Sequence, residues 1–594
     1  MEARTTFIND VIQRNTLLRI PYFQRPYVWE KDYWERFAKD MESTLDSKRK
    51  YFLGAIILKE EEPTDEDTLN GIAQKHLVID GQQRLTTLCI YMKVLYGMTG
   101  KKNEFDYHFL QATGSQDSVI IHSCVDRSDF HVIMHLPTLK DVTTLKDVNK
   151  ESNICKAYMF FRDFLEKRKQ EGINLLQLLN TVTARVTFVT ISLRREDDEQ
   201  QIFDTINSLG EPLSTGDLIK NFLYKPEDED AYKNNWKPVF DDLSVKDFWN
   251  SSSSKSRQSK KKEDKTIERF FHAFVRIKMW DFKDNDGLNK DEFVKIGNVF
   301  RTCKSFVEFN VDRQELANEI IEYAKLFKDH LNPEDLNNRL PQYAGIKRIS
   351  CIINATKNYA PTPYVLYVLR NVKDEGERNK IFGYLESYLI RRIIVGKKTN
   401  SDSELFGESL INKKAVTYND FKKYIDGRVN SQTSMPSRND LKFAYANKTL
   451  KDSSASLILY MYETKLSKPS DPNTIIGGLN DYYAVQLMPK DPKSHKWPIQ
   501  NSKDKEEARK QLAESLGNYF LIEADGGKKT MKKHVDSSCD IKTGVMLKWS
   551  TNIRSNQRLI DVQTKQPISK WEEKDIKERN TLYMDIFDKE IWPA

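Results

Sequence analysis

The segment His76–Met92 (HLVIDGQQRLTTLCIYM) combines residue types that can hold a phosphate group. An apolar run of strand character ends at Asp80, Gly81 follows at once, and an apolar-periodic helix begins near Leu85. Gly81 permits a tight turn, and the helix N-terminus offers free N–H groups and a partial positive charge. Arg84 can donate two parallel hydrogen bonds to phosphate oxygens. We expect a phosphate-binding corner here, while a polar strand-turn-helix corner without a ligand remains the alternative.

A second motif, Ile20–Phe37 (IPYFQRPYVWEKDYWERF), places Gln24 and Arg25 between two aromatic-rich stretches. Pro21 and Pro26 exclude a regular helix in this stretch. Two interpretations are open. The loop either presents Gln24 and Arg25 to a ligand, or acts as an aromatic anchor that packs the N-terminal arm onto its domain.

A third motif, Gln201–Tyr224 (QIFDTINSLGEPLSTGDLIKNFLY), contains a break between two helical patterns. A helix should end near Gly210, and Ser214 or Thr215 should cap the next one, with Asp217 in its first turn. Ordinary helix capping explains most of the polar residues at this break.

These three motifs, in this order, resemble the N-terminal domain of GmrSD-type (type IV) restriction enzymes. The resemblance implies a fold similar to ParB and sulfiredoxin and a nucleoside triphosphatase site at the D-G-Q-Q-R corner, with Mg²⁺ or another divalent cation as cofactor. It implies that Asp80 is a catalytic residue that manages metal or water, and that Arg84 is a catalytic residue that contacts phosphate. The nucleotide-binding residues would be Gln24, Arg25, Gly81, Gln82, Gln83, Arg84 and Thr86.

The C-terminal part resembles the remainder of the same family. Tyr384–Phe406 resembles the helical segment that joins the first domain to an HNH-type nuclease domain, LGNYFLI (Leu516–Ile522) resembles the L-G-N-L motif of that domain, and the pattern from Trp571 to IWP resembles its last helix. The resemblance implies anti-phage defence, with double-stranded and modified phage DNA as the ligand. A protein partner and a homo-oligomer remain open.

One departure concerns the nuclease centre. The family carries a Glu-His pair before Ile/Leu-Met/Leu-Pro, whereas the matching segment AVQLMPK has Val485 and Gln486. Gln486 cannot act as a general base at neutral pH, unlike a neutral imidazole. His495 and His534 are alternative catalytic positions. Two hypotheses therefore stand: an enzyme that cleaves DNA in a triphosphate-dependent manner, or a nucleotide-gated DNA-binding sensor or scaffold that has an inactive nuclease domain and acts through a partner.

A basic stretch, GGKKTMKKH, precedes the last third of this region. Lysine ammonium groups in such a run are suited to DNA phosphates, and their binding releases counterions. The predicted DNA-binding residues are Lys528, Lys529, Lys532 and Lys533.

Composition limits the classes of protein that fit. The chain has 594 residues, 94 Lys plus Arg against 87 Asp plus Glu, and a formal net charge of +7. Because no apolar run approaches the ~18 residues of a membrane span, we expect no membrane association. The N-terminus has no apolar core of a secretory signal, and the six cysteines lie far apart, so we expect a reduced, cytoplasmic protein.

The elements that must position these residues follow from periodicity. Buried strands are expected at 51–58, 76–79 and 185–193, and helices at 85–95 and 157–164. A polar, Ser/Lys-rich stretch spans 250–266, and the pattern is helical from Thr266 to about Gly396. We predict an α+β protein with a ParB/sulfiredoxin-like domain at 1–235, a linker or long loop at 236–266, a helical connecting region at 267–430 and an HNH-like (ββα-metal-like) domain at 431–594.

Overall fold

The computed structural model describes residues 2–21, 24, 26–46, 49–111, 118–122, 126–137, 139, 142, 149–194, 215–224, 228–252, 265–282, 299–343, 345–429, 431–466, 475, 477–491, 497, 503–550 and 553–594. The chain forms two compact units, Met1–Asn250 with Cys303–Asn318, and Ser251–Thr302 with Glu319–Ala594. Within the described ranges, no helix is both long enough and apolar enough to cross a membrane.

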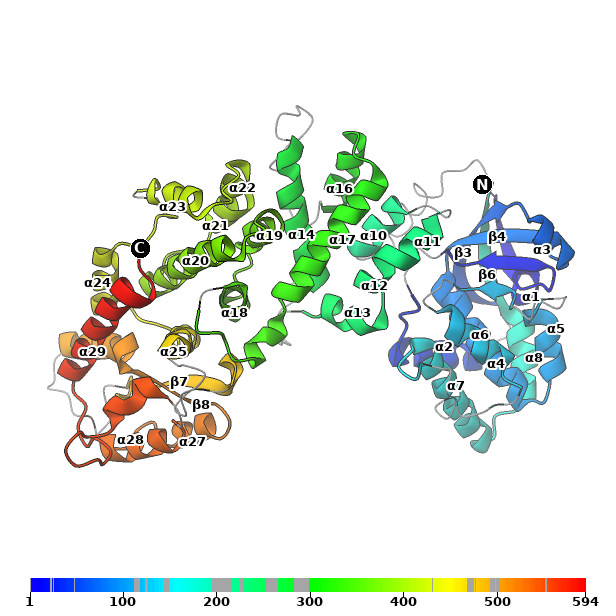
Figure 1. Ribbon diagram of the computed structural model, residues 1–594. Helices are drawn as coiled ribbons and strands as arrows, with labels where there is room; N and C mark the ends of the chain where they lie inside the picture. Colours follow the sequence, from blue (N-terminus) through cyan, green and yellow to red (C-terminus); the bar gives the residue numbers. More distant parts are fainter. Residues whose placement is uncertain are drawn as a thin grey trace. The chain divides into compact units, whose positions relative to one another are not determined.

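A six-stranded mixed sheet forms the centre of the first unit, with the strand order β1-β6-β3-β4-β2-β5 (Figure 1). β4 pairs antiparallel with β3 and parallel with β2. Strands were expected at 51–58, 76–79 and 185–193, and all three are confirmed. The strands are β1 (Glu2–Phe7), β2 (Thr16–Arg19), β3 (Tyr51–Glu61), β4 (Gln74–Asp80), β5 (Ile120–Ile121) and β6 (Val186–Leu193).

The alternation of side chains along the strands separates two apolar clusters. Ile56, Leu58 and Val78 join the main core, whereas Ile57 and Leu77 belong to a small cluster on the other face. The main core is completed by helices that Figure 1 shows on one side of the sheet. These include α2 (Lys31–Ser43), α4 (Gln82–Met98), α7 (Asn153–Gln170) and α8 (Leu175–Arg185).

α4 is the central helix of this layer. Except for the half-buried Arg84, its side chains are buried from Gln82 to Tyr96, because α5 (Lys102–Phe109), α6 (Arg127–His135), α7 and α8 all contact it. The helices predicted at 85–95 and 157–164 are confirmed as parts of α4 and α7. A helix enclosed in this way holds its N-terminal turn in a fixed place.

The first unit extends further along the chain than the sequence suggested. α12 (Lys237–Phe240) and α13 (Leu243–Asn250) lie in the stretch assigned to the linker, and Trp249 is buried among them. The prediction of a linker at 236–266 is therefore wrong for residues 236–250. Residues 253–264 lie outside the described residues.

The third sequence motif is only partly described. α10 (Thr215–Leu223) begins where a helix was expected, with Asp217 in its first turn. The buried Lys220 ammonium lies 3.4 Å from a carboxylate oxygen of Asp217 and 3.3 Å from one of Asp241. Residues 201–214, including the expected break at Gly210, lie outside the described residues.

The second unit contains a helical region arranged around α20 (Glu375–Val395). The guanidinium of Arg348, on α18 (Ile346–Thr356), donates two hydrogen bonds of 2.8 and 3.0 Å to the buried carboxylate of Glu386. The indole N–H of Trp592 donates a third, of 2.7 Å. The expected helical pattern is confirmed for the described residues between 266 and 396, which also include α14 (Thr266–Lys278), α17 (Arg313–His330) and α19 (Thr362–Asn371).

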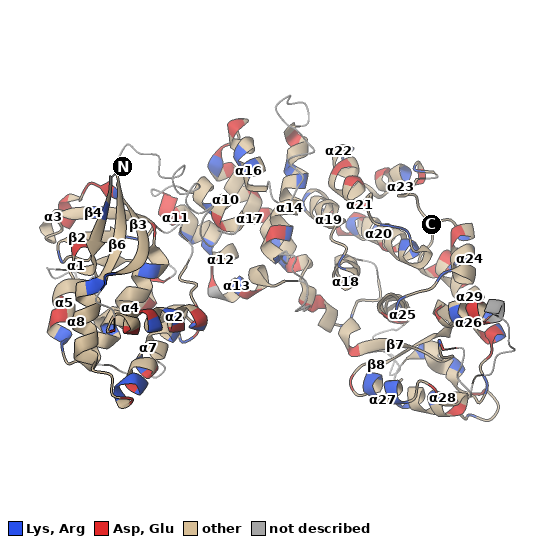
Figure 2. Ribbon diagram, turned by 180° about the vertical axis from the view of Figure 1, so that it is seen from behind, with Lys and Arg blue, Asp and Glu red and all other residues tan. Residues whose placement is uncertain are grey.

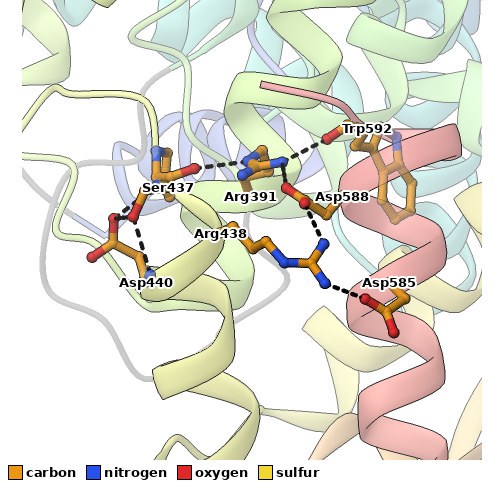
Figure 3. Close-up of polar contacts among 8 residues, drawn as sticks. Arg391, Ser437, Arg438, Asp440, Asp585, Asp588 and Trp592 are labelled. Carbon is orange, nitrogen blue, oxygen red and sulfur yellow. Dashed lines mark hydrogen bonds and ion pairs between the residues drawn. The ribbon is translucent and has the colours of Figure 1, made fainter.

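The end of the chain is fixed to this helical region (Figure 3). α29 (Glu573–Ile586) continues into η11 (Phe587–Ile591), which carries Asp588. The guanidinium of Arg391 lies 2.9 Å from Asp588, and that of Arg438, on α24 (Arg438–Asn447), lies 2.8 Å from it. Arg438 also pairs with Asp585. These contacts tie α29 to both α20 and α24.

A two-stranded antiparallel sheet lies beside these helices. β7 (Tyr482–Gln486) pairs with β8 (Tyr519–Glu523), so that Gln486 lies opposite Tyr519. β7 follows α25 (Asp452–Leu466) in the chain and packs against it. The remaining helices of this module are α26 (Lys503–Ala513), α27 (Gly527–Lys533) and α28 (Cys539–Lys548).

Asn518 and α29 hold the start of β8. The side chain of Asn518 accepts a hydrogen bond from the Met488 N–H (2.9 Å) and donates to the Met488 and Ala513 carbonyls (both 2.8 Å). Arg579 of α29 donates to the Tyr519 carbonyl (2.7 Å), and its guanidinium lies 3.7 Å from the centre of the Phe520 ring. The L-G-N stretch and the last helix therefore interlock.

Candidate functional site

The first candidate site lies at the C-terminal end of β4, where Asp80 is followed by Gly81 and α4. Gly81 is the N-cap of α4 and has φ +95°, a conformation that favours glycine. A Cβ at this position would lie 2.6 Å from Cγ2 of Ile56. The tight turn therefore requires glycine, and it leaves the first amides of α4 without a capping side chain.

Arg84 lies across this corner. Its guanidinium donates a 2.8 Å hydrogen bond to Asp80 and a 2.6 Å hydrogen bond to the backbone carbonyl of Ala55 in β3. Gly54, at φ +128°, makes room for the side chain, because a Cβ there would lie 3.1 Å from Cδ of Arg84. The buried Nε–H of Arg84 has no acceptor among the described residues. The guanidinium is thus held in place through one of its NH2 groups, and its Nε–H is still available.

The second sequence motif is brought to the same corner. The Gln24 amide donates hydrogen bonds of 2.6 and 2.9 Å to backbone carbonyls at the end of β4. The side chain of Gln83 accepts from the Val28 N–H (3.0 Å) and donates to the Pro26 carbonyl (3.2 Å). Both amides therefore brace the loop against the corner. Arg25 lies outside the described residues.

Thr86 braces the first turns of α4 from inside the core. Its fully buried hydroxyl lies 2.9 Å from Nε2 of His122 and donates to the Gln82 carbonyl at 2.8 Å. Burial lowers the pKa of His122 to about 3, so the imidazole is neutral. Burial likewise raises the pKa of Asp126 to about 6, and this side chain accepts the N–H of Tyr27 at 2.7 Å. Gln82 is itself nearly buried.

The second candidate site is a cavity of about 760 Å³ in the C-terminal module, and Gln486 lies in its wall. The Gln486 amide donates a 2.9 Å hydrogen bond to the Tyr519 hydroxyl. That hydroxyl donates to Asp452 (2.9 Å), and the Tyr483 hydroxyl donates to the other oxygen of the same carboxylate (2.7 Å). Burial raises the pKa of both tyrosines, so their hydroxyls stay protonated. One N–H of the Gln486 amide is therefore bound within the module.

Only some of the predicted basic residues face this cavity. Figure 2 shows Lys and Arg gathered on α27. Lys528 and Lys532 line the cavity, whereas Lys529 and Lys533, on the same helix, do not. His534 follows α27, and its Nδ1 lies 3.1 Å from the Ser537 hydroxyl, also outside the lining. His495 lies outside the described residues.

A protein-only metal site is not evident at either place. Within the described part of the chain, no group of three or more His, Cys, Asp or Glu side chains is arranged to hold a metal ion. Asp80 is a single carboxylate, and one of its two oxygens is bound to Arg84. A cation at Asp80 would need further ligands from a phosphate group or from water.

Several residues of both sites were not found from the sequence. Gly54 interrupts an apolar strand, which commonly indicates a bulge or a close approach, and β3 does shift register there. His122 offered no signal, since a lone histidine has no pattern. Asp452 and Tyr519 lie far from Gln486 in the sequence, and only folding places them next to it.

Comparison with known proteins adds one finding to this geometry. A search of curated proteins found no match to the chain. Residues 7–224 match the family model described as GmrSD restriction endonuclease, N-terminal domain. The matched region contains Gln24, Asp80 and Arg84, and it covers nearly all of the described sheet. The expected resemblance is confirmed for this part of the chain: residues 7–224 are similar to the N-terminal domain of GmrSD restriction endonucleases.

Proposed function

We propose that this protein is an anti-phage protein of the type IV restriction class, in which nucleoside triphosphate turnover in the first unit accompanies recognition of foreign, modified DNA. The match to the GmrSD N-terminal domain supports the restriction class. The observation that carries the triphosphate site is the geometry of Arg84, which is fixed by Asp80 and Ala55 and keeps a buried Nε–H donor without an acceptor among the described residues.

The residues present suit a triphosphate with a divalent cation. Gly54 and Gly81 remove side chains on either side of Arg84, and the first amides of α4 supply further donors with a favourable dipole. The Asp80 oxygen that does not bind Arg84 forms no bond with the described residues, so it can contribute one ligand to Mg²⁺ shared with phosphate oxygens. Asp80 would thereby manage metal or water, and Arg84 would contact phosphate.

The remaining nucleotide-site residues take two kinds of role in this proposal. Gly81 and the start of α4 would contact the phosphates directly. Gln24, Gln83 and Thr86 would position the corner, because their side chains already bind backbone groups or His122. Arg25, between the braced Gln24 and Pro26, would add a second positive charge.

A second candidate function differs in the C-terminal module. The order of β7, β8 and α27 suits a ββα nuclease module, but Gln486 stands where the family has its histidine and is bound to Tyr519. This favours a nucleotide-gated DNA-binding sensor or scaffold whose nuclease domain is inactive and which acts through a partner.

One assay tests the function and separates the two candidates. The full chain is incubated with modified and unmodified DNA, with and without triphosphate and Mg²⁺, and both phosphate release and strand cleavage are measured. We expect phosphate release that falls at least tenfold in Arg84→Ala and is abolished in Asp80→Ala. Arg162→Ala, on the same unit but away from the corner, is the control. Unchanged turnover in both corner variants would reject the site, and cleavage by the unaltered chain would reject the sensor.

A further inference from the structure

The lining of the cavity in the C-terminal module is partly apolar and partly basic. Ala484, Val485, Met531 and Val535 contribute the apolar lining. Five lysines from four segments surround it, namely Lys490, Lys510, Lys528, Lys532 and Lys542. Such a combination is suited to a ligand that is flat and apolar at one end and anionic at the other.

Lys542 is the residue of the cavity that most clearly favours an anionic ligand. Its side chain is 2% exposed, and its ammonium donates one hydrogen bond, of 3.1 Å, to the Val535 carbonyl. It forms no ion pair with the described residues, and the Trp497 ring centre lies 6.0 Å away. An ammonium group has three donors, so a buried one with a single acceptor is under-satisfied. An anion in the cavity would supply the missing acceptors.

Lys528 and Lys532 provide a second positive element. They lie one turn apart on α27, and the Lys528 ammonium lies 4.2 Å from the centre of the Tyr483 ring. Neither lysine forms an ion pair within the described part of the chain. Acidic side chains also line the cavity, but Asp452 is already bound by two tyrosine hydroxyls. Asp491, Glu506 and Glu507 line the cavity as well, whereas the charged residues that α27 and α28 contribute to the lining are all lysines.

We propose that the cavity binds a single nucleotide unit, with the base against the apolar lining and the phosphate on Lys528, Lys532 and Lys542. Its volume of about 760 Å³ falls within the ~300–1,000 Å³ of small-molecule sites. The same chemistry can come from a free nucleotide or from a nucleotide extruded from DNA. We commit to the extruded nucleotide, which rests on the proposed DNA-binding function, because Lys529 and Lys533 continue the basic surface of α27 outside the cavity, where flanking phosphates would lie.

Extrusion gives a measurable preference for weakened base pairs. An unpaired base costs less to remove from the stack, so a short duplex with one mismatch should bind about tenfold more tightly than its perfect counterpart. Affinity of the full chain is measured by fluorescence anisotropy at one fixed salt concentration. The preference should vanish in the double variant Lys528→Ala with Lys532→Ala, and in Lys542→Met.

The matched control is Lys529→Ala with Lys533→Ala. It removes the same charge from the same exposed helix, so it should weaken both duplexes alike and keep the tenfold ratio. If this control loses the ratio and the cavity variants keep it, the inference is overturned. Circular dichroism of each variant shows whether it has folded.

A second measurement separates the two sources of the nucleotide. Deoxycytidine monophosphate and inorganic phosphate are titrated into the full chain by calorimetry. Binding of the nucleotide at least tenfold tighter than phosphate, lost in Lys542→Met, supports a site for a base with its phosphate. Such binding without a mismatch preference identifies a free nucleotide as the ligand. Equal binding of phosphate and nucleotide, or no binding of either, together with equal affinity for both duplexes, overturns the inference while DNA binding itself stands. Absence of all DNA binding instead rejects the proposed function.

Discussion

The corner at Asp80–Arg84 and the cavity at Gln486 use their polar groups in opposite ways. At the corner, Arg84 is held by two acceptors and retains a donor without an acceptor among the described residues. At the cavity, Gln486 is bound to Tyr519, which is bound to Asp452. The donor at the corner lacks an acceptor among the described residues, whereas the Gln486 amide is held by a neighbouring side chain of its own module. The two ends of the chain are therefore expected to respond differently to mutation.

The largest expected effect comes from introducing at the cavity the Glu-His pair that the resemblance implies. Val485→Glu with Gln486→His supplies an imidazole that can take a proton from water, and general-base catalysis contributes typically ~10²–10⁴-fold. We expect DNA nicking in the presence of Mg²⁺ to rise by that factor over the unaltered chain, measured on supercoiled plasmid.

The control for this double variant is Val485→Glu alone, which provides no base and should leave nicking unchanged. Robust cleavage by the unaltered chain, lost in His534→Ala or His495→Ala, would contradict the hypothesis of an inactive nuclease domain. It would show instead that one of these histidines is the general base.

The next prediction compares how much Asn518 and Gln486 contribute to the stability of the C-terminal module. Asn518→Ala leaves buried backbone groups of Met488 and Ala513 without partners, each worth ~1–3 kcal/mol, so we expect a loss of about 2–4 kcal/mol in the free energy of unfolding. Gln486→Ala should change it by less than about 0.5 kcal/mol. Urea unfolding followed by circular dichroism measures both, and equal losses would refute the distinction.

A third test concerns the corner. Gly54→Ala places a methyl group 3.1 Å from Cδ of Arg84 at a φ of +128°, and backbone strain of this kind costs ~1–3 kcal/mol. We expect both a loss of stability and a weaker affinity for triphosphate, measured with a fluorescent nucleotide. Gly172→Ala is the matched control, since its φ is +95° and nothing lies within 4 Å of an added Cβ. Gly172→Ala should lose stability but keep its affinity for triphosphate. A similar loss of affinity in this control would mean that backbone strain, and not the contact with Arg84, governs binding.

The smallest expected effect reports on Lys542. Burial lowers its pKa to about 8 from 10.5, so between these values the unfolded chain binds more protons than the native one. Stability therefore rises with pH across this window, by about 1 kcal/mol from pH 8 to pH 9. In Lys542→Met this rise should be absent. A rise of the same size in both chains would assign it to other groups.

Periodicity predicted most of the first unit. The buried strands and the central helix carry continuous apolar or apolar-periodic runs, and their positions were expected from these runs. The short helices at 237–250 were not expected, because their apolar residues are interrupted by a proline and three aspartates and belong to no long run. Their burial around Trp249 is a tertiary effect that local sequence does not display.

The two candidate sites also differ in how far they could be predicted from the sequence. Asp80, Gly81 and Arg84 lie within five residues, so their juxtaposition could be predicted from a strand followed by a helix. The cavity brings together residues from α25, β7, α26, α27 and α28, and no local pattern encodes that assembly. The lysines of α27 were predicted as one group, yet only the helix orientation separates Lys528 and Lys532 from their neighbours.

The clamp between α29 and the start of β8 has an evolutionary consequence. Arg579 binds the backbone around Gly517 and Tyr519, and Asn518 secures the end of β7, without any contribution from the side chain at position 486. The residues that hold the framework of this module are therefore separate from the residue at position 486. Substitutions at position 486 can accumulate over generations while the shape of the module is preserved.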